Sequence, residues 1–102
     1  MLEHAREALS LAHGKSRADL DIDRQLNLSL ARLLEIIGEA PNRVPRAVQS
    51  VHPQIPWPEV VSLRNRLIHG YDSVDFDVLW QVVTIDLPLL VADLEKIVPA
   101  EE

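Results

Sequence analysis

Apolar residues recur every three or four positions over most of the chain, which is the spacing of one face of an α-helix. A first short helix is predicted before Gly14, which acts as its terminator, and a second should span residues 21–40, capped by Ser16 or Asp21. The first helix has its apolar positions at Leu2, Ala5, Leu9 and Ala12; the second has Ile22, Leu26, Leu30, Leu33, Leu34 and Ile37. Gly38 near the end of the second helix costs roughly 1 kcal/mol against alanine and is expected to admit a close neighbour.

The last predicted helix is capped by Asp75, runs to about Ile97 and carries two apolar stripes. The first is a core seam: Phe76, Leu79, Trp80, Val83, Leu87, Leu90, Leu94 and Ile97. The second lies nearly opposite: Val78, Val82, Ile85 and Leu89. Because a surface helix normally has one apolar stripe, the second is expected either to lie centrally in the bundle or, the favoured alternative, to meet another chain. Pro88 should bend the helix or have its freed carbonyl satisfied by a neighbour.

Residues 41–58 form the main irregular segment, with five of the seven prolines. A short helix is predicted at residues 46–51, with Val44, Val48 and Val51 turned inward. His52 is interpreted as a solvated loop histidine, with a role in binding RNA or a partner as the alternative. Together the patterns predict an all-α, up-and-down four-helix bundle with a short extra helix in the proline-rich connector, one domain over residues 1–102, and a dimer.

Composition narrows the function classes. The chain has 102 residues, 47% of them hydrophobic, only four aromatics and no cysteine, which suits an aliphatic helical bundle without disulfides. No apolar run is long enough to span a bilayer, so a cytoplasmic location is expected. The net charge of −6 disfavours broad, nonspecific binding to nucleic acid. Residues 41–71 nevertheless hold four arginines against one acid, a layout that fits contact with a few phosphates or an ordinary solvated surface.

A third long helix should begin at Trp57, between two prolines, and stop at Gly70. On a straight helix, Arg64 would fall in the middle of the apolar arc, while Asn65, Arg66 and His69 would lie on the opposite face. A guanidinium on an apolar face needs an anionic partner. One interpretation is therefore a buried ion pair, with Glu39 as the first candidate partner; the other is an anion site beside a titratable imidazole.

The pattern Arg64, four residues, His69, one residue and Tyr71 resembles the R-x4-H-x-Y signature of HEPN domains, specifically of HepT-like toxins. Further landmarks of that family occur in the same order over about residues 26–98, at 34–40, 52–57, 63–71, 79–80 and 86–90. The resemblance implies a ribonuclease with a composite site at a homodimer interface. It also implies a partner, a small nucleotidyltransferase antitoxin of the MntA type, which can transfer AMP to the motif tyrosine, here Tyr71. AMP there would block RNA by charge repulsion and bulk.

The candidate residues suit metal-independent RNA cleavage, in which the ribose 2′-hydroxyl attacks the adjacent phosphate. The sequence shows no convincing metal site and no nucleotide-binding loop, so no cofactor is expected. An imidazole with an unperturbed pKa near about 6.5, His69, can exchange protons at neutral pH, and Arg64 can stabilise charge on phosphorus. Asn65 could orient His69 or a phosphate oxygen, and Arg66 and Tyr71 could position the substrate.

Geometry on one helix is a difficulty for this mechanism, because Arg64 and His69 would lie roughly 140° apart. Two copies of the helix meeting across a two-fold axis would resolve it. An alternative of another class is a noncatalytic helper domain that holds the nucleotide or substrate of a nucleotidyltransferase. A third interpretation makes the motif only a structural brace at the helix end.

Overall fold

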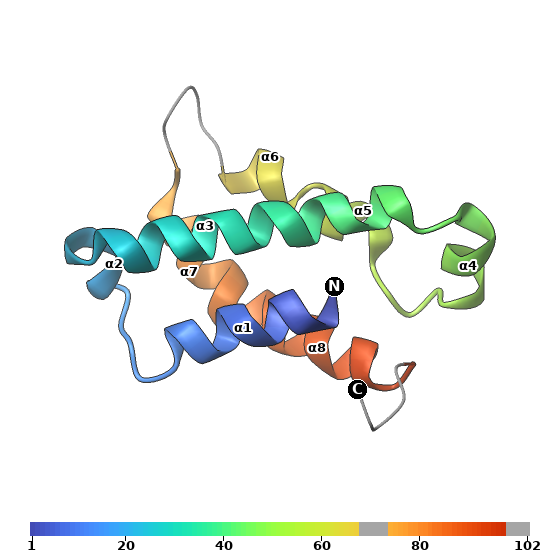
Figure 1. Ribbon diagram of the computed structural model, residues 1–102, viewed down its shortest axis with the longest axis horizontal. Helices are drawn as coiled ribbons and strands as arrows, with labels where there is room; N and C mark the ends of the chain where they lie inside the picture. Colours follow the sequence, from blue (N-terminus) through green and yellow to red (C-terminus); the bar gives the residue numbers. More distant parts are fainter. Residues whose placement is uncertain (68–73, 98–102) are drawn as a thin grey trace.

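A computed structural model describes residues 1–67 and 74–97 of the protein and shows a helical bundle (Figure 1). Its elements are α1 (Leu2–Ala12), α2 (Asp19–Ile22), α3 (Arg24–Glu39), the 3₁₀ turn η1 (Ala40–Arg43), α4 (Arg46–Val51), α5 (Trp57–Val61), α6 (Leu63–Leu67), α7 (Phe76–Gln81), the π-helical segment η2 (Val82–Asp86) and α8 (Leu87–Glu95). Four segments, α1, α3, α5–α6 and α7–η2–α8, alternate in direction along the long axis (Figure 1). The predicted all-α, up-and-down architecture is confirmed.

Helix α3 is the centre of the fold and packs against α1, α5, α6 and α7. It begins later than predicted, because Asp23 is its cap and accepts a hydrogen bond from the Leu26 N–H at 3.0 Å. The residues before the cap form the separate turn α2, so Ile22 is 83% exposed and its predicted place in the core is wrong. The other predicted core positions of this helix are buried: Leu26, Leu30, Leu33, Leu34 and Ile37.

Two glycines occupy the positions that the sequence suggested. Gly14 ends the turn after α1 with a φ of 76°, a conformation that favours glycine. Gly38 lies against α5, where an added Cβ would come within 3.3 Å of the Val60 carbonyl oxygen. The predicted close neighbour of Gly38 is therefore confirmed, and it is the backbone of α5.

The predicted last helix is continuous but widens into a π-helical turn, η2, just before Pro88. Proline lacks the N–H that would bond to the carbonyl four residues earlier, and a π turn accommodates that loss. Asp75 caps α7 as predicted, accepting hydrogen bonds from the N–H groups of Asp77 and Val78. Most of the predicted core seam is buried, at Leu79, Val83, Leu87, Leu90 and Leu94.

The second stripe of this helix divides between core and surface. Val82 is fully buried in the chain's own core, so its predicted contact with another chain is wrong. Ile85 and Leu89, which follow the π turn, are 55% and 65% exposed. The outward face is therefore shorter than predicted and is confined to two residues.

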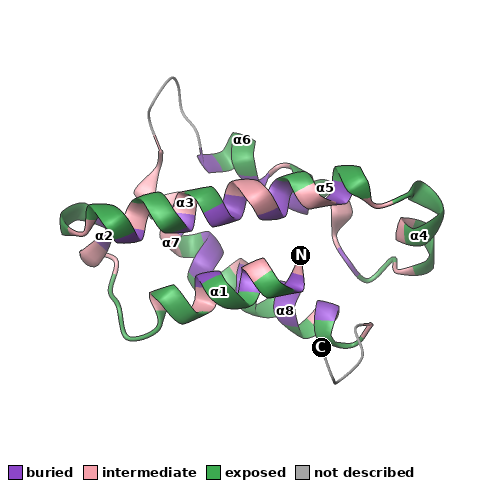
Figure 2. Ribbon diagram, viewed as in Figure 1, coloured by how far each residue is buried: buried purple, intermediate pink, exposed green. Residues whose placement is uncertain are grey.

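Helix α4 lies at one end of the long axis, beyond the paired helices, and contributes no buried side chain (Figures 1 and 2). Its predicted bounds are confirmed, but the predicted inward orientation of Val48 and Val51 is wrong, because both are exposed. Polar contacts hold it instead: the Gln49 side-chain amide donates to the carbonyls of Pro41 and Val44 at 2.9 and 3.1 Å.

Candidate active site

The motif segment is divided into two short helices at Ser62. Its hydroxyl donates to the Glu59 carbonyl at 2.8 Å, and its backbone, at φ −77° and ψ −6°, ends α5. Pro56 precedes this helix and Pro58 lies in its first turn, as the sequence suggested. The predicted single helix from Trp57 onward is therefore wrong, because α5 ends at Val61 and α6 begins at Leu63.

Arg64 lies on the exposed side of α6. Leu63 and Leu67 are buried, at 4% and 1% exposure, and anchor α6 to the core. Arg64, Asn65 and Arg66, which lie between these two leucines, are all exposed. The prediction that Arg64 lies in the middle of the apolar arc is wrong, because the buried face is narrower than that arc: Val61, which belongs to the arc, is 41% exposed.

Arg64 is not paired with the carboxylate that the sequence suggested. Within residues 1–67 and 74–97 its guanidinium forms no ion pair, and Glu39 is exposed and accepts a hydrogen bond from the Asn42 amide at 3.4 Å. The ends of α3 and α6 are nonetheless neighbours, since a Cβ on Gly38 would lie 3.8 Å from the Arg64 backbone nitrogen. Arg64 is therefore a solvent-facing cation that no carboxylate of the described residues neutralises.

His69 and Tyr71, the other two residues of the motif, lie outside the described residues, as do the predicted helix stop at Gly70 and the pairing of Asn65 with His69. The two flanks of this segment are described. The Asp75 N–H donates to the Leu67 carbonyl at 2.7 Å, so the end of α6 and the start of α7 lie next to each other.

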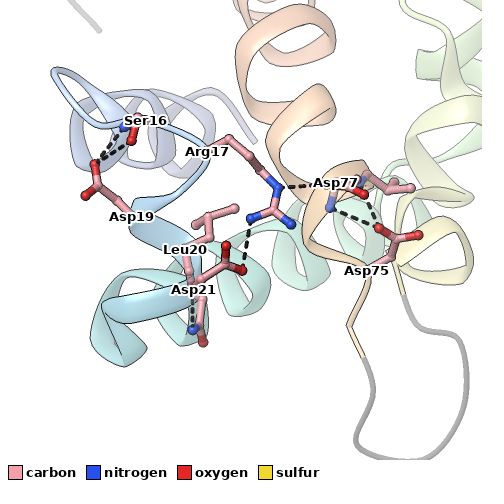
Figure 3. A network of polar contacts seen from close by, with 9 residues as sticks. Ser16, Arg17, Asp19, Leu20, Asp21, Asp75 and Asp77 are labelled. Carbon is pink, nitrogen blue, oxygen red and sulfur yellow. Dashed lines mark hydrogen bonds and ion pairs between the residues drawn. The ribbon is translucent and has the colours of Figure 1, made fainter.

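A polar network fixes the start of α7 to the connection between α1 and α3 (Figure 3). Arg17 donates to Asp77 at 2.8 Å and to Asp21 at 3.1 Å, and its guanidinium lies 5.9 Å from the centre of the Phe76 ring. The hydrogen bond to Asp77, followed by that to Asp21, raises the pKa of Arg17. This network, which sequence patterns did not indicate, anchors one flank of the motif segment.

Arg66 forms the other connection that the sequence missed. Its guanidinium pairs with Asp86 of η2 at 3.2 Å, with both side chains about two-fifths exposed (38% and 41%). The pair lies beside a groove of about 110 Å³ between α5–α6 and the last helix, lined by apolar side chains and by Glu59, Asp86 and Asp93. With three acids against one arginine, the groove has a net negative charge, which disfavours phosphate.

Among the residues that the structure describes, no three histidine, cysteine, aspartate or glutamate side chains are grouped so as to hold a metal ion. In that same part of the chain, no helix has the length and apolarity needed to cross a membrane.

The all-α bundle with an outward motif helix places the protein in the HEPN-like class of folds. The family model described as "Ribonuclease HepT-like" matches residues 1–97, and the chain belongs to this family. The chain is 39% identical over 100 residues to "Probable ribonuclease HepT" of Thermococcus cleftensis, an alignment that covers 94% of this chain and 91% of the relative.

Other relatives agree with this assignment. The chain is 32% identical to "Putative RNase MJ1380" of Methanocaldococcus jannaschii, covering 93% of this chain and 87% of the relative. It is 29% identical to "Putative RNase TTE0752" of Caldanaerobacter subterraneus, covering 100% and 91%. No solved structure matches the chain.

Proposed function

We propose that the protein is a metal-independent endoribonuclease and the toxin component of a type VII-like toxin–antitoxin pair. The observation that carries the proposal is Arg64, an exposed guanidinium without an ion pair in the described part of the chain, in a member of the HepT-like ribonuclease family. Within the described residues, four of the eight arginines pair with a carboxylate, and Arg64 is among the four that do not. An arginine left open at the signature position is available for a phosphate.

The reaction needs only the groups of the motif. The ribose 2′-oxygen bonds to phosphorus as its proton leaves, the bond from phosphorus to the 5′-oxygen breaks, and that oxygen gains a proton. The products are a 2′,3′-cyclic phosphate and a 5′-hydroxyl. In this mechanism His69 exchanges the proton with one of the two oxygens, and Arg64 stabilises the charge that develops on the phosphoryl oxygens. Asn65 and Tyr71 orient the imidazole and the substrate.

The active site is proposed to form between two copies of the chain. Asp86, the partner of Arg66, lies directly after Ile85 and three residues before Leu89, the two exposed apolar residues of the last helix. The Arg66–Asp86 ion pair therefore joins the outward-facing motif helix to the apolar surface that a second copy would cover. Such an isologous contact brings two α6 helices to one two-fold axis, so that Arg64 of one copy can act with His69 of the other.

The proposed partner is a nucleotidyltransferase antitoxin of the MntA type. The phenolic oxygen of Tyr71 would attack the α-phosphate of ATP, forming a Tyr–AMP ester and releasing pyrophosphate. The added phosphate would pair with the Arg64 guanidinium and so prevent that guanidinium from binding RNA. Mass spectrometry of the protein co-expressed with such an enzyme should show one or more AMP additions, which a Tyr71→Phe variant should lack.

Cleavage of defined RNAs in EDTA tests the proposed activity. The parent, free of AMP, should cut RNA and leave cyclic phosphate ends, and a His69→Ala variant should not. If several RNAs survive both proteins, the noncatalytic helper-domain alternative takes the place of the ribonuclease proposal. If cutting requires added Mg²⁺ or leaves other ends, the metal-independent mechanism is wrong.

A further inference from the structure

A second group of arginines without an ion pair in the described part of the chain lies away from the motif helix. It belongs to residues 40–54, a segment that contains η1 and α4 and that we call the arm. Within residues 1–67 and 74–97, four arginines form ion pairs: Arg6, Arg17, Arg32 and Arg66. Among the described residues four form none: Arg24, Arg43, Arg46 and Arg64. Arg43 and Arg46 are the only charged residues of the arm apart from the titratable His52, so the arm has a charge of +2 in a chain of −6.

Pro41 at the base of the arm is buried, whereas α4 is held by polar contacts. Gln49 ties α4 to the carbonyls of Pro41 and Val44, and the Trp57 indole N–H is shared between the carbonyls of Gln49 and His52 at 3.2 and 3.1 Å. Because these contacts satisfy backbone groups and leave both guanidinium groups exposed, the arginines are held on a preformed support. A support with no buried side chain on α4 contributes little to packing.

We infer that the arm is a second contact for the RNA backbone, outside the site of cleavage. The positive charge of the arm indicates which ligand it binds. A single-stranded polyanion gains from each arginine that neutralises a phosphate and releases counterions. The groove beside α6 is acidic, so phosphates that extend beyond Arg64 are repelled there and attracted to the arm. This inference rests on the proposed ribonuclease activity and adds a requirement for longer RNA.

Binding of long, unstructured 2′-O-methyl RNA, which cannot be cut, tests the inference as a function of salt. Relative to the parent, Arg43→Gln/Arg46→Gln should bind about tenfold more weakly near physiological salt, and the slope of log K against log salt should fall by about 1.4, at roughly 0.7 per lost phosphate contact. Both side chains are exposed and form no ion pair with any described residue, so the variant should fold; a thermal melt checks this.

Arg24→Gln is the matched control, since Arg24 is also exposed and without an ion pair in the described part of the chain, but lies at the other end of α3 from the arm (Figure 1). It should bind the long RNA like the parent. If Arg24→Gln loses as much affinity as the double variant, the effect is general electrostatics and the inference is overturned. An unchanged affinity and slope in the double variant also overturns the inference. This holds even if the double variant loses binding to a protein partner, because the arm would then contact protein and not RNA.

Cleavage of a short RNA of a few nucleotides separates this inference from the proposed function. The double variant should cut the short RNA at the parent's rate, because the arm is not part of the catalytic machinery. A parent that cuts no RNA counts against the proposed function. If the parent cuts RNA but the double variant binds long RNA as well as the parent does, only the inference about the arm is overturned.

Discussion

Helices α3 and α6 use their side chains in opposite ways. Helix α3 has 16 residues and buries a stripe of five aliphatic side chains against its neighbours. Helix α6 has five residues, buries only Leu63 and Leu67, and turns Arg64, Asn65 and Arg66 outward. The free energy of folding therefore comes from the long stripe, whereas the short helix is held by two leucines and is free to present polar groups. Stability and activity should separate along this line.

Removal of a core side chain on α3 should have the largest effect on stability. Leu34 is fully buried, and Leu34→Ala should lower the free energy of unfolding by about 2–5 kcal/mol, through lost burial and the cavity left behind. Chemical denaturation measures this change. Leu28→Ala on the same helix is the control, because Leu28 is 52% exposed and its loss should change stability by no more than about 0.5 kcal/mol. Equal losses from the two variants would contradict the assigned register of α3.

Substitution of Arg64 should lower activity and leave stability almost unchanged. Arg64→Ala should lower the rate of RNA cleavage by about 10²–10³-fold, since a donor to the developing phosphoryl charge is lost. Its free energy of unfolding should stay within about 0.5 kcal/mol of the parent, because Arg64 is exposed and unpaired in the described part of the chain. Arg24→Ala serves as a matched loss of charge that leaves cleavage intact. A strongly destabilised Arg64→Ala protein would restore the buried ion pair as the better interpretation.

The packing of α3 against α5, the helix that precedes α6, can be tested at Gly38. Gly38→Val should destabilise the fold by about 1–3 kcal/mol, because its Cβ meets the Val60 carbonyl at 3.3 Å and its two methyl groups need further space. Thermal unfolding measures the change. At Gly14 no atom lies within 4 Å of an added Cβ, so Gly14→Ala should cost only the positive φ, about 1 kcal/mol. A Gly38→Val protein as stable as the parent would mean that α5 does not pack on α3 as described.

The smallest expected effect is at the cap of α3. Asp23→Ala should cost about 1 kcal/mol, since the Leu26 N–H loses its acceptor. Asp23→Asn, which keeps an acceptor oxygen, should retain most of the stability. Urea titrations of both variants give the comparison. Cleavage by Asp23→Ala should be unchanged at temperatures where it is folded, and a selective loss of cleavage would show that α3 and the site are coupled more closely than the packing indicates.

Apolar periodicity predicted the parts of the fold where long helices bury one face. It placed the α3 stripe, the core seam of the last helix and the Asp75 cap, because burial and backbone capping leave regular marks in the sequence. It misplaced Ile22, because an aspartate two residues later than the expected start provides the cap. Short helices give few periods to read, so Val48 and Val51 of α4 were assigned to the wrong side.

The sequence supplied the candidate residues of the site, but it did not predict the geometry around Arg64. The motif indicated Arg64, but the buried face of this segment is narrower than the predicted apolar arc, since Val61 is 41% exposed, and Arg64 lies outside that face. The contacts of Arg17 with Asp77 and of Arg66 with Asp86 join residues 60 and 20 positions apart. Local spacing carries no information about such pairs, and only the folded chain reveals them.

Mixing two inactive variants tests most directly whether two copies build one ribonuclease site. Arg64→Ala and His69→Ala proteins are unfolded together, refolded together and assayed on RNA in EDTA. Half of the refolded dimers should be mixed, and each mixed dimer has one site with both groups, so about a quarter of the parent's activity should return. An inactive mixture that contains mixed dimers, beside an active parent, would place Arg64 and His69 of a single chain in each site and contradict the shared site.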